Sequence, residues 1–542
     1  MPYDYLVLLI LFLVIITCVI SYNIYLNRSY NENLKFMAES AWEKQIERKY
    51  NSQNIKFLLD GKEKVDSLTW QDLEMDQIFS YFDRSFSIAG SQALYKKLHS
   101  LNYSIKDKKI IDEILENKEA ASKLGKNFLK YINFKDDDFF ELLKTSSPDE
   151  KIKAMKPLIY ACFFLNLFSL ALFFINMLLA LLLFLILRIV SGVINHKISK
   201  LSSAKYKSFL SIRNLQSLYL ELQKSDLKLE GLIEDLDRHE NLIKLIKKNL
   251  GSIYTKTGSD IDFLYTSFDN LFLHQARTIC KSTDFVNENL ESINNLYKDL
   301  ADIDMYLGLA ISYESIEDKC MVDFKEDNLL SAKNLHNPIL YYKGSSVPNT
   351  FEFNKSILLT GSNASGKSTF LRSLGSNIIF AESLGFAFAD YFSLPRKNLY
   401  SAIDIRDSID KNVSYFMAET LAIKRMIENK NSIYILDEIF KGTNTIDRIS
   451  AALFTLKYLS KQGLVIAASH DIELTKLLDN FDNYHFEEII ENRDIVFDYK
   501  LKEGPSKTRN AIEILRIENY PDEIVEKAKE FSKILEDKKI EI

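Results

Sequence analysis

Two glycines, a lysine and four hydroxyl residues lie within nine positions, between Gly361 and Thr369. Their order, G-x-x-x-x-G-K-[ST], is typical of a loop whose backbone N–H groups surround the phosphates of a nucleotide. Glycine lets the backbone approach a phosphate without a Cβ in the way. Lys367 would reach the β- and γ-phosphates, and the Ser368 hydroxyl would ligate Mg²⁺. The phosphate-binding residues predicted from this pattern are Gly361, Ser362, Asn363, Ala364, Ser365, Gly366, Lys367, Ser368 and Thr369.

Such a loop needs a strand before it and a helix after it. Residues 355–360 are a short apolar run that predicts a buried strand, and residues 370–379 predict a helix. The N-terminus of that helix adds the positive end of its dipole to a phosphate site. A glycine turn before a helix, with no ligand, is the alternative. The further polar clusters downstream favour the nucleotide site.

Two acids end a second apolar run, at residues 432–438. Asp437, at the end of a buried parallel strand, can hold Mg²⁺, and Glu438 can orient and deprotonate an attacking water. Residues 463–468 predict a third strand, and His470 beyond it can sense the γ-phosphate by a hydrogen bond. Because ligands bind at the carboxyl ends of parallel strands, these clusters predict one site. An exposed acidic turn and a structural histidine are the alternatives.

Several motifs in this region resemble those of the MutS family, in that family's order. TGSNASGKST at residues 360–369 resembles the MutS ATPase loop TGPN-x-x-GKST, and SYFMAE at 414–419 resembles STFM-x-E. LDEIFKGTNTID at 436–447 is similar to MDEIGRGTST-x-D, and the residues around His470 are similar to ATH-x-x-EL. The tail, residues 504–528, also fits the family. The resemblance covers about residues 330–530 and implies a dimeric, Mg²⁺-dependent ATPase that acts on DNA.

The chain also departs from the MutS pattern. The serine of the family's GTST step is Asn444 here. In MutS-like dimers this segment reaches the neighbouring subunit's γ-phosphate, so the resemblance implies a role in trans for Asn444 and Thr445. Nothing near Ser346 matches the phenylalanine that MutS proteins stack on adenine, so adenine contacts stay unassigned. We expect no mismatch-reading N-terminal domain, and we expect the FKE triplet at Phe324 to lie in a helical region.

The resemblance extends more weakly upstream, where residues 73–94 look like the start of the MutS helical core. Between residues 202 and 328, apolar residues recur at helical spacing, which predicts lever- and clamp-like helices. Lys244, Lys247 and Lys248 form a basic face there. Such a face can contact nucleic acid, but a solvated helix face is the alternative.

Composition limits the classes of partner. Net charge is −6 and the sequence pI is about 5.8, which argues against a nucleic-acid-binding surface over the whole chain. Only 8 prolines and 16 glycines occur in 542 residues, which favours long helices over a loop-rich fold. Four cysteines without a C-x-x-C pair and seven scattered histidines predict free thiols and no zinc site.

Two stretches are apolar enough to enter a bilayer. Residues 5–20, extendable to 25, predict an uncleaved anchor. A signal peptide is the alternative, but residues 1–4 hold no Lys or Arg. A single helix over residues 158–187 would be about 45 Å long, whereas the hydrocarbon core is about 30 Å thick. Two short spans, 158–175 and 177–194, joined near Asn176, therefore fit better than one tilted span. A buried helix pair in a soluble protein is the alternative.

Basic residues flank both stretches, at positions 28–44, 151–156 and 188–200. The positive-inside rule places all three flanks in the cytoplasm. The predicted topology has the N-terminus outside and residues 27–157 and 195–542 in the cytoplasm, where ATP is available. A hairpin at 158–194 satisfies this topology because it returns the chain to the side that it left.

The sequence thus predicts an α/β P-loop NTPase domain of MutS type, with a mostly parallel sheet between helices, plus an α-helical region and transmembrane helices. The expected parts are an anchor (1–26), a cytoplasmic helical region (27–157), a transmembrane hairpin (158–194), a lever- and clamp-like region (195–329) and the ATPase domain (330–542). The expected cofactors are ATP and Mg²⁺. The expected partners are a second copy of the chain, the membrane, and duplex or branched DNA.

Two functions stay open at this point. One is a clamp that senses mismatches or DNA structure, as the resemblance implies. The other is a membrane-tethered mechanical ATPase that acts on a protein or membrane partner without DNA. A transporter ATPase is disfavoured because no LSGGQ-type signature occurs.

Overall fold

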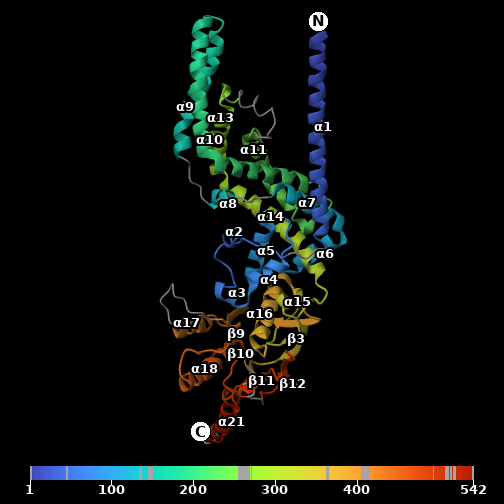
Figure 1. The fold of residues 1–542 in the computed structure, drawn as a ribbon, viewed down its shortest axis with the longest axis vertical. Helices are drawn as coiled ribbons and strands as arrows, with labels where there is room; N and C mark the ends of the chain where they lie inside the picture. Colours follow the sequence, from blue (N-terminus) through green and yellow to red (C-terminus); the bar gives the residue numbers. More distant parts are fainter. Residues whose placement is uncertain are drawn as a thin grey trace.

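The computed structural model is an elongated molecule with its α/β part at one end and two helical columns at the other (Figure 1). The N-terminus lies at the tip of one column and the C-terminus lies at the α/β end. The structure describes residues 3–43, 47–132, 137–144, 150–253, 269, 271–361, 365–404, 415–491, 494–506, 512, 515–516 and 520–539.

A six-stranded sheet forms the centre of the α/β part. Its order is β14 (Lys502–Glu503), β11 (Asp482–His485), β5 (Ile357–Thr360), β10 (Leu464–Ala468), β9 (Ser432–Asp437) and β8 (Asn398–Ala402). All neighbours from β11 to β8 pair in parallel, and only the edge strand β14 is antiparallel. The predicted mostly parallel sheet is therefore confirmed.

Helices cover both faces of this sheet, which explains why its central strands β5, β10 and β9 are continuous apolar runs. Ile433 and Ile435 of β9 belong to the core that contains α16 (Lys367–Leu384). Tyr434 and Leu436, the alternate residues, belong to the core that contains α17 (Tyr415–Glu428) and α18 (Thr445–Ser460). The period-two alternation of a strand thus divides β9 between two helix layers.

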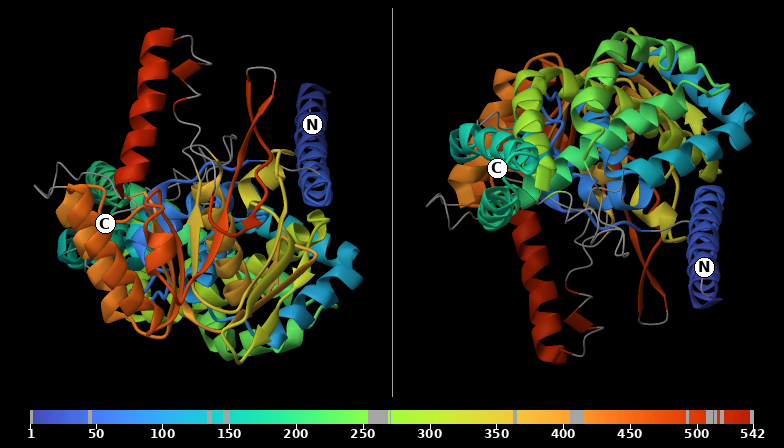
Figure 2. Two further views of the ribbon diagram at one scale, coloured as in Figure 1. Left: turned by 90° about the horizontal axis from the view of Figure 1, so that it is seen from below. Right: turned by 90° about the horizontal axis from the view of Figure 1, so that it is seen from above.

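Shorter strands surround this sheet. A four-stranded sheet has the order β2 (Asp323–Lys325), β7 (Tyr391–Pro395), β3 (Leu330–Leu335) and β4 (Asn349–Phe353). β1 (Cys320–Met321) pairs with β6 (Phe386–Ala387), and β12 (Glu488–Glu491) pairs with β13 (Asp494–Phe497). The β12–β13 hairpin and the C-terminal helix α21 (Asp522–Lys539) project from the same side of the molecule (Figure 2). α15 (Pro338–Tyr342) and α19 (Leu474–Leu477) are short helices of this part.

One prediction about this region is wrong. Phe324 lies in strand β2, not in a helix, because β2 pairs with the distant strand β7. The helical region ends at Ser315, and the strands begin at Cys320 rather than at the predicted boundary of 330.

The helical part lies between the α/β end and the two columns. Its N-terminal helices are α2 (Ser52–Ile55), α3 (Ser67–Asp72), α4 (Met75–Phe82), α5 (Ile88–Ser100), α6 (Ile105–Glu116), α7 (Lys118–Tyr131) and α8 (Asp137–Lys144). They pack with η1 (Leu229–Gly231), η2 (Glu234–His239), α11 (Glu240–Leu250), α13 (His274–Glu288) and α14 (Leu290–Ser315). One continuous core joins these helices to the α16 face of the large sheet.

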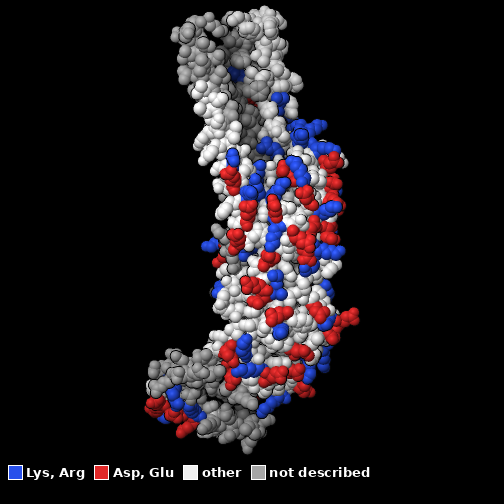
Figure 3. All heavy atoms as spheres, turned by 90° about the vertical axis from the view of Figure 1, so that its right-hand side faces the viewer, with Lys and Arg blue, Asp and Glu red and all other residues white. Residues whose placement is uncertain are grey.

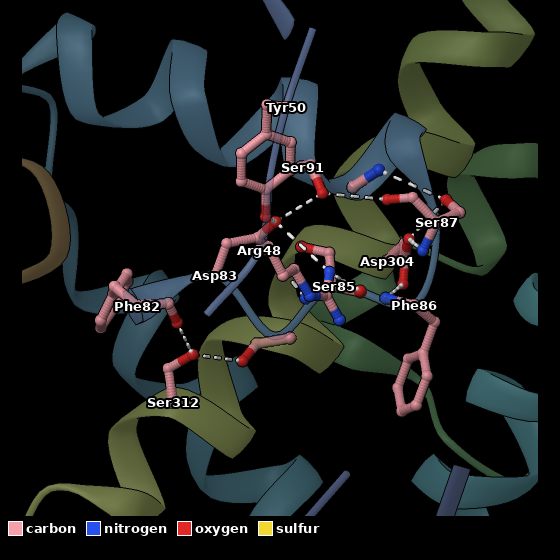
Figure 4. A network of polar contacts seen from close by, with 12 residues as sticks. Arg48, Tyr50, Phe82, Asp83, Ser85, Phe86, Ser87, Ser91, Asp304 and Ser312 are labelled. Atoms are coloured by element: carbon pink, nitrogen blue, oxygen red, sulfur yellow. Dashed lines mark hydrogen bonds and ion pairs between the residues drawn. The ribbon is translucent and has the colours of Figure 1, made fainter. Parts of the chain in front are cut away.

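Two buried aspartates hold the loop between α4 and α5 against α14 (Figure 4). Asp304 of α14 accepts hydrogen bonds from the backbone N–H groups of Phe86, at 2.9 Å, and Ser87, at 2.7 Å. Asp83 accepts from the Ser85 backbone, from the Ser91 hydroxyl and from Tyr50. Gly90 is required at this contact because a Cβ there would lie 2.5 Å from the Asp304 carboxylate.

The two columns are α1 (Tyr3–Ser40) and a hairpin of α9 (Glu150–Leu172) and α10 (Met177–Leu222). Asn176 lies at the turn and caps α10 by accepting a hydrogen bond from Leu179 N at 3.1 Å, so the predicted turn is confirmed. By length and composition, two described helices could cross a membrane, at Lys151–Leu172 and Met177–Ser202. α10 continues without a break to Leu222, so the boundary predicted between residues 194 and 195 is not a structural one.

Candidate nucleotide site

The glycine-rich loop leaves β5 at Thr360 and enters α16 at Lys367. Gly361 and Gly366 have φ values of 144° and 104°, which L-residues rarely adopt. A Cβ on Gly361 would lie 2.7 Å from the carbonyl oxygen of Phe486. The predicted strand, loop and helix are therefore present in order. Ser362, Asn363 and Ala364 lie outside the described residues.

The two predicted Mg²⁺ ligands lie in direct contact. The Ser368 hydroxyl, in the first turn of α16, donates a hydrogen bond to Asp437 Oδ2 at the end of β9. Within the described part of the chain, Asp437 Oδ1 is buried and has no hydrogen-bond partner. Burial raises the pKa of Asp437, and the Ser368 hydrogen bond opposes this rise. A half-buried hydroxyl beside a buried carboxylate oxygen that has no partner among the described residues fits the all-oxygen ligands that Mg²⁺ prefers.

Lys367 points into the loop rather than into solvent. Its side chain is buried, and its ammonium donates to the Gly361 carbonyl oxygen at 2.9 Å. Ser365 Oγ, also in the loop, is buried and has no hydrogen-bond partner among the described residues. The loop therefore holds a cation and a polar atom that can pair with a phosphate.

Glu438 follows β9 in a left-handed backbone conformation, with φ 50°. Its carboxylate contacts His470, which follows β10, and Lys441 Nζ at 2.6 Å. Burial raises the pKa of Glu438, but the hydrogen bonds from His470 and Lys441 outweigh it and lower the pKa to about 2. Glu438 is thus a permanent anion at neutral pH, which suits it to orient a water molecule.

Asn444 and Thr445 do not join this cluster. Both are exposed at the start of α18, where the Asn444 side chain caps the helix by accepting from Asp447 N at 3.0 Å. Their exposure agrees with a contact to another copy of the chain. Their role in trans stays a prediction.

The structure adds three residues to which the sequence assigned no role. Glu419 of α17 is buried and accepts hydrogen bonds from the backbone N–H groups of Lys441, at 3.1 Å, and Gly442, at 3.3 Å. It thereby fixes the segment that follows Glu438. Arg448 binds Asp471 through two hydrogen bonds, at 2.9 and 2.7 Å, and so fixes the residue next to His470. For Glu419, the signal in the sequence was the FMAE motif that ends at this residue.

A pocket of about 470 Å³ opens beside the loop. Lys367, Ser368 and Glu438 line one part of it, and Val347 and Tyr499 line another. Asn349 holds the Tyr499 segment in place by donating to Tyr499 O at 3.1 Å and accepting from Leu501 N at 2.7 Å. The apolar and aromatic part of the pocket is where a nucleotide base would fit. It was not predictable because Tyr499 lies far from the loop in sequence.

The backbone contacts of Glu419 lead to a testable prediction. Glu419→Gln keeps one of the two oxygens that accept hydrogen bonds from the backbone N–H groups of Lys441 and Gly442. One of these two hydrogen bonds is therefore lost, and the segment after Glu438 becomes less rigid. We expect ATP turnover to fall by about tenfold, equivalent to about 1.4 kcal/mol, with little change in nucleotide affinity. Glu428→Gln, on an exposed position of the same helix, is the control. Unchanged turnover in the Glu419 variant would contradict this role.

The fold and the site define an α/β nucleotide-site domain attached to a large helical portion. Residues 357–536 match the family MutS domain V, so this part of the chain is similar to the C-terminal region of MutS proteins.

Curated relatives agree with this assignment. A DNA mismatch repair protein MutS from Pseudothermotoga lettingae is 32% identical over 227 residues, which is 40% of this chain and 28% of that protein. One from Thermotoga sp. (strain RQ2) is 27% identical over 326 residues, 58% of this chain and 40% of that protein. One from Streptococcus uberis is 28% identical over 265 residues, which is 46% of this chain and 31% of that protein. The chain thus spans less than half the length of each of these three relatives.

Proposed function

We propose that this chain is a membrane-tethered, Mg²⁺-dependent ATPase with a P-loop NTPase domain of MutS type. The contact between Ser368 and Asp437, beside an Asp437 oxygen that has no partner in the described part of the chain, carries the proposal. Ser368 and Asp437 would hold Mg²⁺, which neutralises phosphate charge when bound. Loop residues 361–369 would bind the phosphates of ATP.

The remaining roles follow from the contacts of the chain's own residues. Lys367 would pair with the β- and γ-phosphates. Glu438 would accept a hydrogen bond from the attacking water and orient it, because its carboxylate is charged and lies at the loop pocket. His470 already touches Glu438 and would hydrogen-bond either that carboxylate or the γ-phosphate.

A second copy of the chain is the proposed partner of the ATPase domain. Ile446, Phe454 and Tyr458 of α18 are 78%, 70% and 48% exposed, and apolar side chains exposed together on one face of a helix suit a protein–protein contact. They lie on the helix that Asn444 and Thr445 begin. A head-to-tail dimer would cover this apolar face and bring the two residues toward the partner's nucleotide.

The membrane tether is supported by the position of two apolar segments. α1 and the α9–α10 hairpin are far apart in sequence, yet both project at the end of the molecule opposite the α/β part (Figure 1). One bilayer could receive both, and the nucleotide site would then face the cytoplasm. On the face shown in Figure 3, charged side chains cover the middle of the molecule, and few of the described side chains at this end are charged.

Two kinds of partner are candidates for the target on which the proposed ATPase acts. The curated relatives named as DNA mismatch repair proteins support duplex or branched DNA. The surface favours the alternative, a protein or membrane partner, because Lys and Arg are interspersed with Asp and Glu on the displayed face and form no continuous basic stripe (Figure 3). Net charge is −6.

The test is the ATPase rate of the purified full chain in detergent or vesicles, with and without duplex, branched and mismatched DNA, at two salt concentrations. We expect Mg²⁺-dependent hydrolysis that Lys367→Ala abolishes by removing nucleotide binding. Stimulation by DNA that fades with salt would indicate a tethered DNA clamp, because phosphate contacts release counterions. A rate indifferent to DNA would support the second candidate, and no hydrolysis in the wild type would refute the ATPase proposal.

A further inference from the structure

A polar layer crosses the α9–α10 hairpin partway along its length. The Arg188 guanidinium of α10 donates to Asn166 Oδ1 of α9 at 2.7 Å and to the backbone oxygen of Leu271 at 3.2 Å. The Asn166 amide donates to Ser191 Oγ at 3.1 Å. One turn further along α10, Asn195 donates to Asp269 at 3.0 Å.

A third segment packs against the hairpin below this layer and carries charges. Leu273, Ala276 and Ile279 share a core with Cys162 and Leu187 of the hairpin. The Arg277 guanidinium lies 3.8 Å from the centre of the Phe163 ring, and Lys156 pairs with Asp284 at 2.5 Å. Leu273 itself has a left-handed backbone, so the helix is interrupted between Phe272 and His274, next to the polar layer.

This arrangement limits how deep the hairpin can lie in a bilayer. Non-helical backbone and charged side chains are excluded from lipid-exposed positions in the hydrocarbon core. Arg188 of the polar layer is partly exposed, and Arg277, Lys156 and Asp284 lie below it, so an arrangement that keeps these charges out of lipid puts the polar layer at the boundary of the hydrocarbon.

The part of the hairpin beyond the polar layer is short and uncharged. Residues 167–187 contain no Asp, Glu, Lys or Arg. At the tip, Phe174 is 91% exposed and Ile175 is 84% exposed, so the turn itself is apolar. The α10 arm from Met177 to Leu187 is about 16 Å long at about 1.5 Å per residue. That is about half of the roughly 30 Å hydrocarbon core.

We propose that the hairpin enters only the cytoplasmic leaflet and that its tip ends near the middle of the bilayer. It therefore does not cross the membrane twice, as the sequence alone suggested. Lys151, Lys153, Lys197 and Lys200, exposed below the polar layer, would lie near the anionic headgroups of that leaflet. This inference rests on the proposed membrane location of the chain.

The depth of the tip can be measured by fluorescence quenching. Phe174→Trp is prepared in the full-length protein and reconstituted into vesicles that carry a quencher either at the end of the acyl chains or on the headgroup. We expect acyl-end quenching to exceed headgroup quenching at least threefold, after subtraction of the wild-type signal from Trp42 and Trp70. Leu178→Trp, also at the exposed tip, is a second reporter. Leu220→Trp, on the same helix near its cytoplasmic end, is the control and should be quenched by neither lipid.

The outcomes separate the inference from the membrane proposal. Dominant headgroup quenching of the tip, with vesicle-bound protein, would show that the tip lies at a membrane surface rather than near the middle of the bilayer and would overturn the inference alone. Protein that does not float with the vesicles would overturn the membrane tether and the inference together. Bound protein with no tip quenching would also overturn the inference, because α1 alone would then be the anchor.

Discussion

Glu438→Gln is expected to bind ATP with near-normal affinity and to hydrolyse it at least about 100-fold more slowly than the wild type, in line with the usual contribution of a positioned acid or base. The substitution keeps the size of the side chain and one carbonyl oxygen. It removes the negative charge that contacts His470 and Lys441. Without that charge, the side chain polarises and orients the attacking water poorly.

Single-turnover kinetics and equilibrium nucleotide binding, measured on the same preparation, separate these effects. Glu352→Gln, an exposed glutamate on β4, is the matched control and should behave as the wild type. If Glu438 only held His470 and Lys441 in place, binding and thermal stability would fall together with turnover. Normal turnover in Glu438→Gln would remove Glu438 from the reaction.

The parts of this site that the sequence predicted are those set by local pattern. The strand before Gly361, the helix that begins at Lys367 and the strand that ends at Asp437 each follow from a few adjacent residues. Because parallel strands share an edge, their polar ends had to meet, and the contact between Ser368 and Asp437 is the result.

The parts that the sequence did not predict depend on distant pairing. Strand β2 is three residues long and exists because β7 pairs with it, so nothing near Phe324 marks it as a strand. Tyr499 reaches the pocket because Asn349 binds its backbone. The length of α10 has a different cause: no proline or strong cap interrupts the chain between Ile194 and Leu222.

The depth of the hairpin was also beyond sequence patterns. Hydropathy counts Arg188 as one charge in an apolar run, and flanking lysines define only which side each end faces. In the proposed arrangement, the packing of α13, with Arg277 against Phe163, would place a charged segment beside the hairpin and so shorten the part available to lipid.

The largest expected effect on stability concerns Asp304, which is fully buried in the helical part beside Asp83 (Figure 4). Burial raises the pKa of Asp304 to about 6, although hydrogen bonds from Ser87 and Phe86 oppose the rise. In the unfolded chain the pKa of Asp is about 3.9. The folded state therefore binds the proton more tightly, so folding takes up a proton between about pH 4 and pH 6.

The sign of the pH dependence follows directly. The contribution of Asp304 to stability is largest below about pH 4 and is lost as the pH rises through about 6, a change of about 3 kcal/mol. The amide introduced by the substitution Asp304→Asn cannot titrate. We expect the thermal midpoint of the wild type, relative to that of Asp304→Asn, to fall as the pH rises from 4 to 7.

Differential scanning fluorimetry of both proteins across this pH range measures the effect, since the titrating groups that do not interact with Asp304 are shared and cancel in the comparison. Asp83 interacts with Asp304, so the measured slope reports the two carboxyl groups together. A difference in thermal midpoint that is the same at every pH reflects the altered hydrogen bonds to Ser87 and Phe86. Only the change of that difference with pH reports protonation. Asp112→Asn, on the surface of α6 where the carboxylate pairs with Lys108, is the control and should stay parallel to the wild type. Parallel curves for Asp304→Asn as well would show that Asp304 is not protonated in the folded chain over this range. The loop between α4 and α5 would then be held by a charged carboxylate at every pH tested.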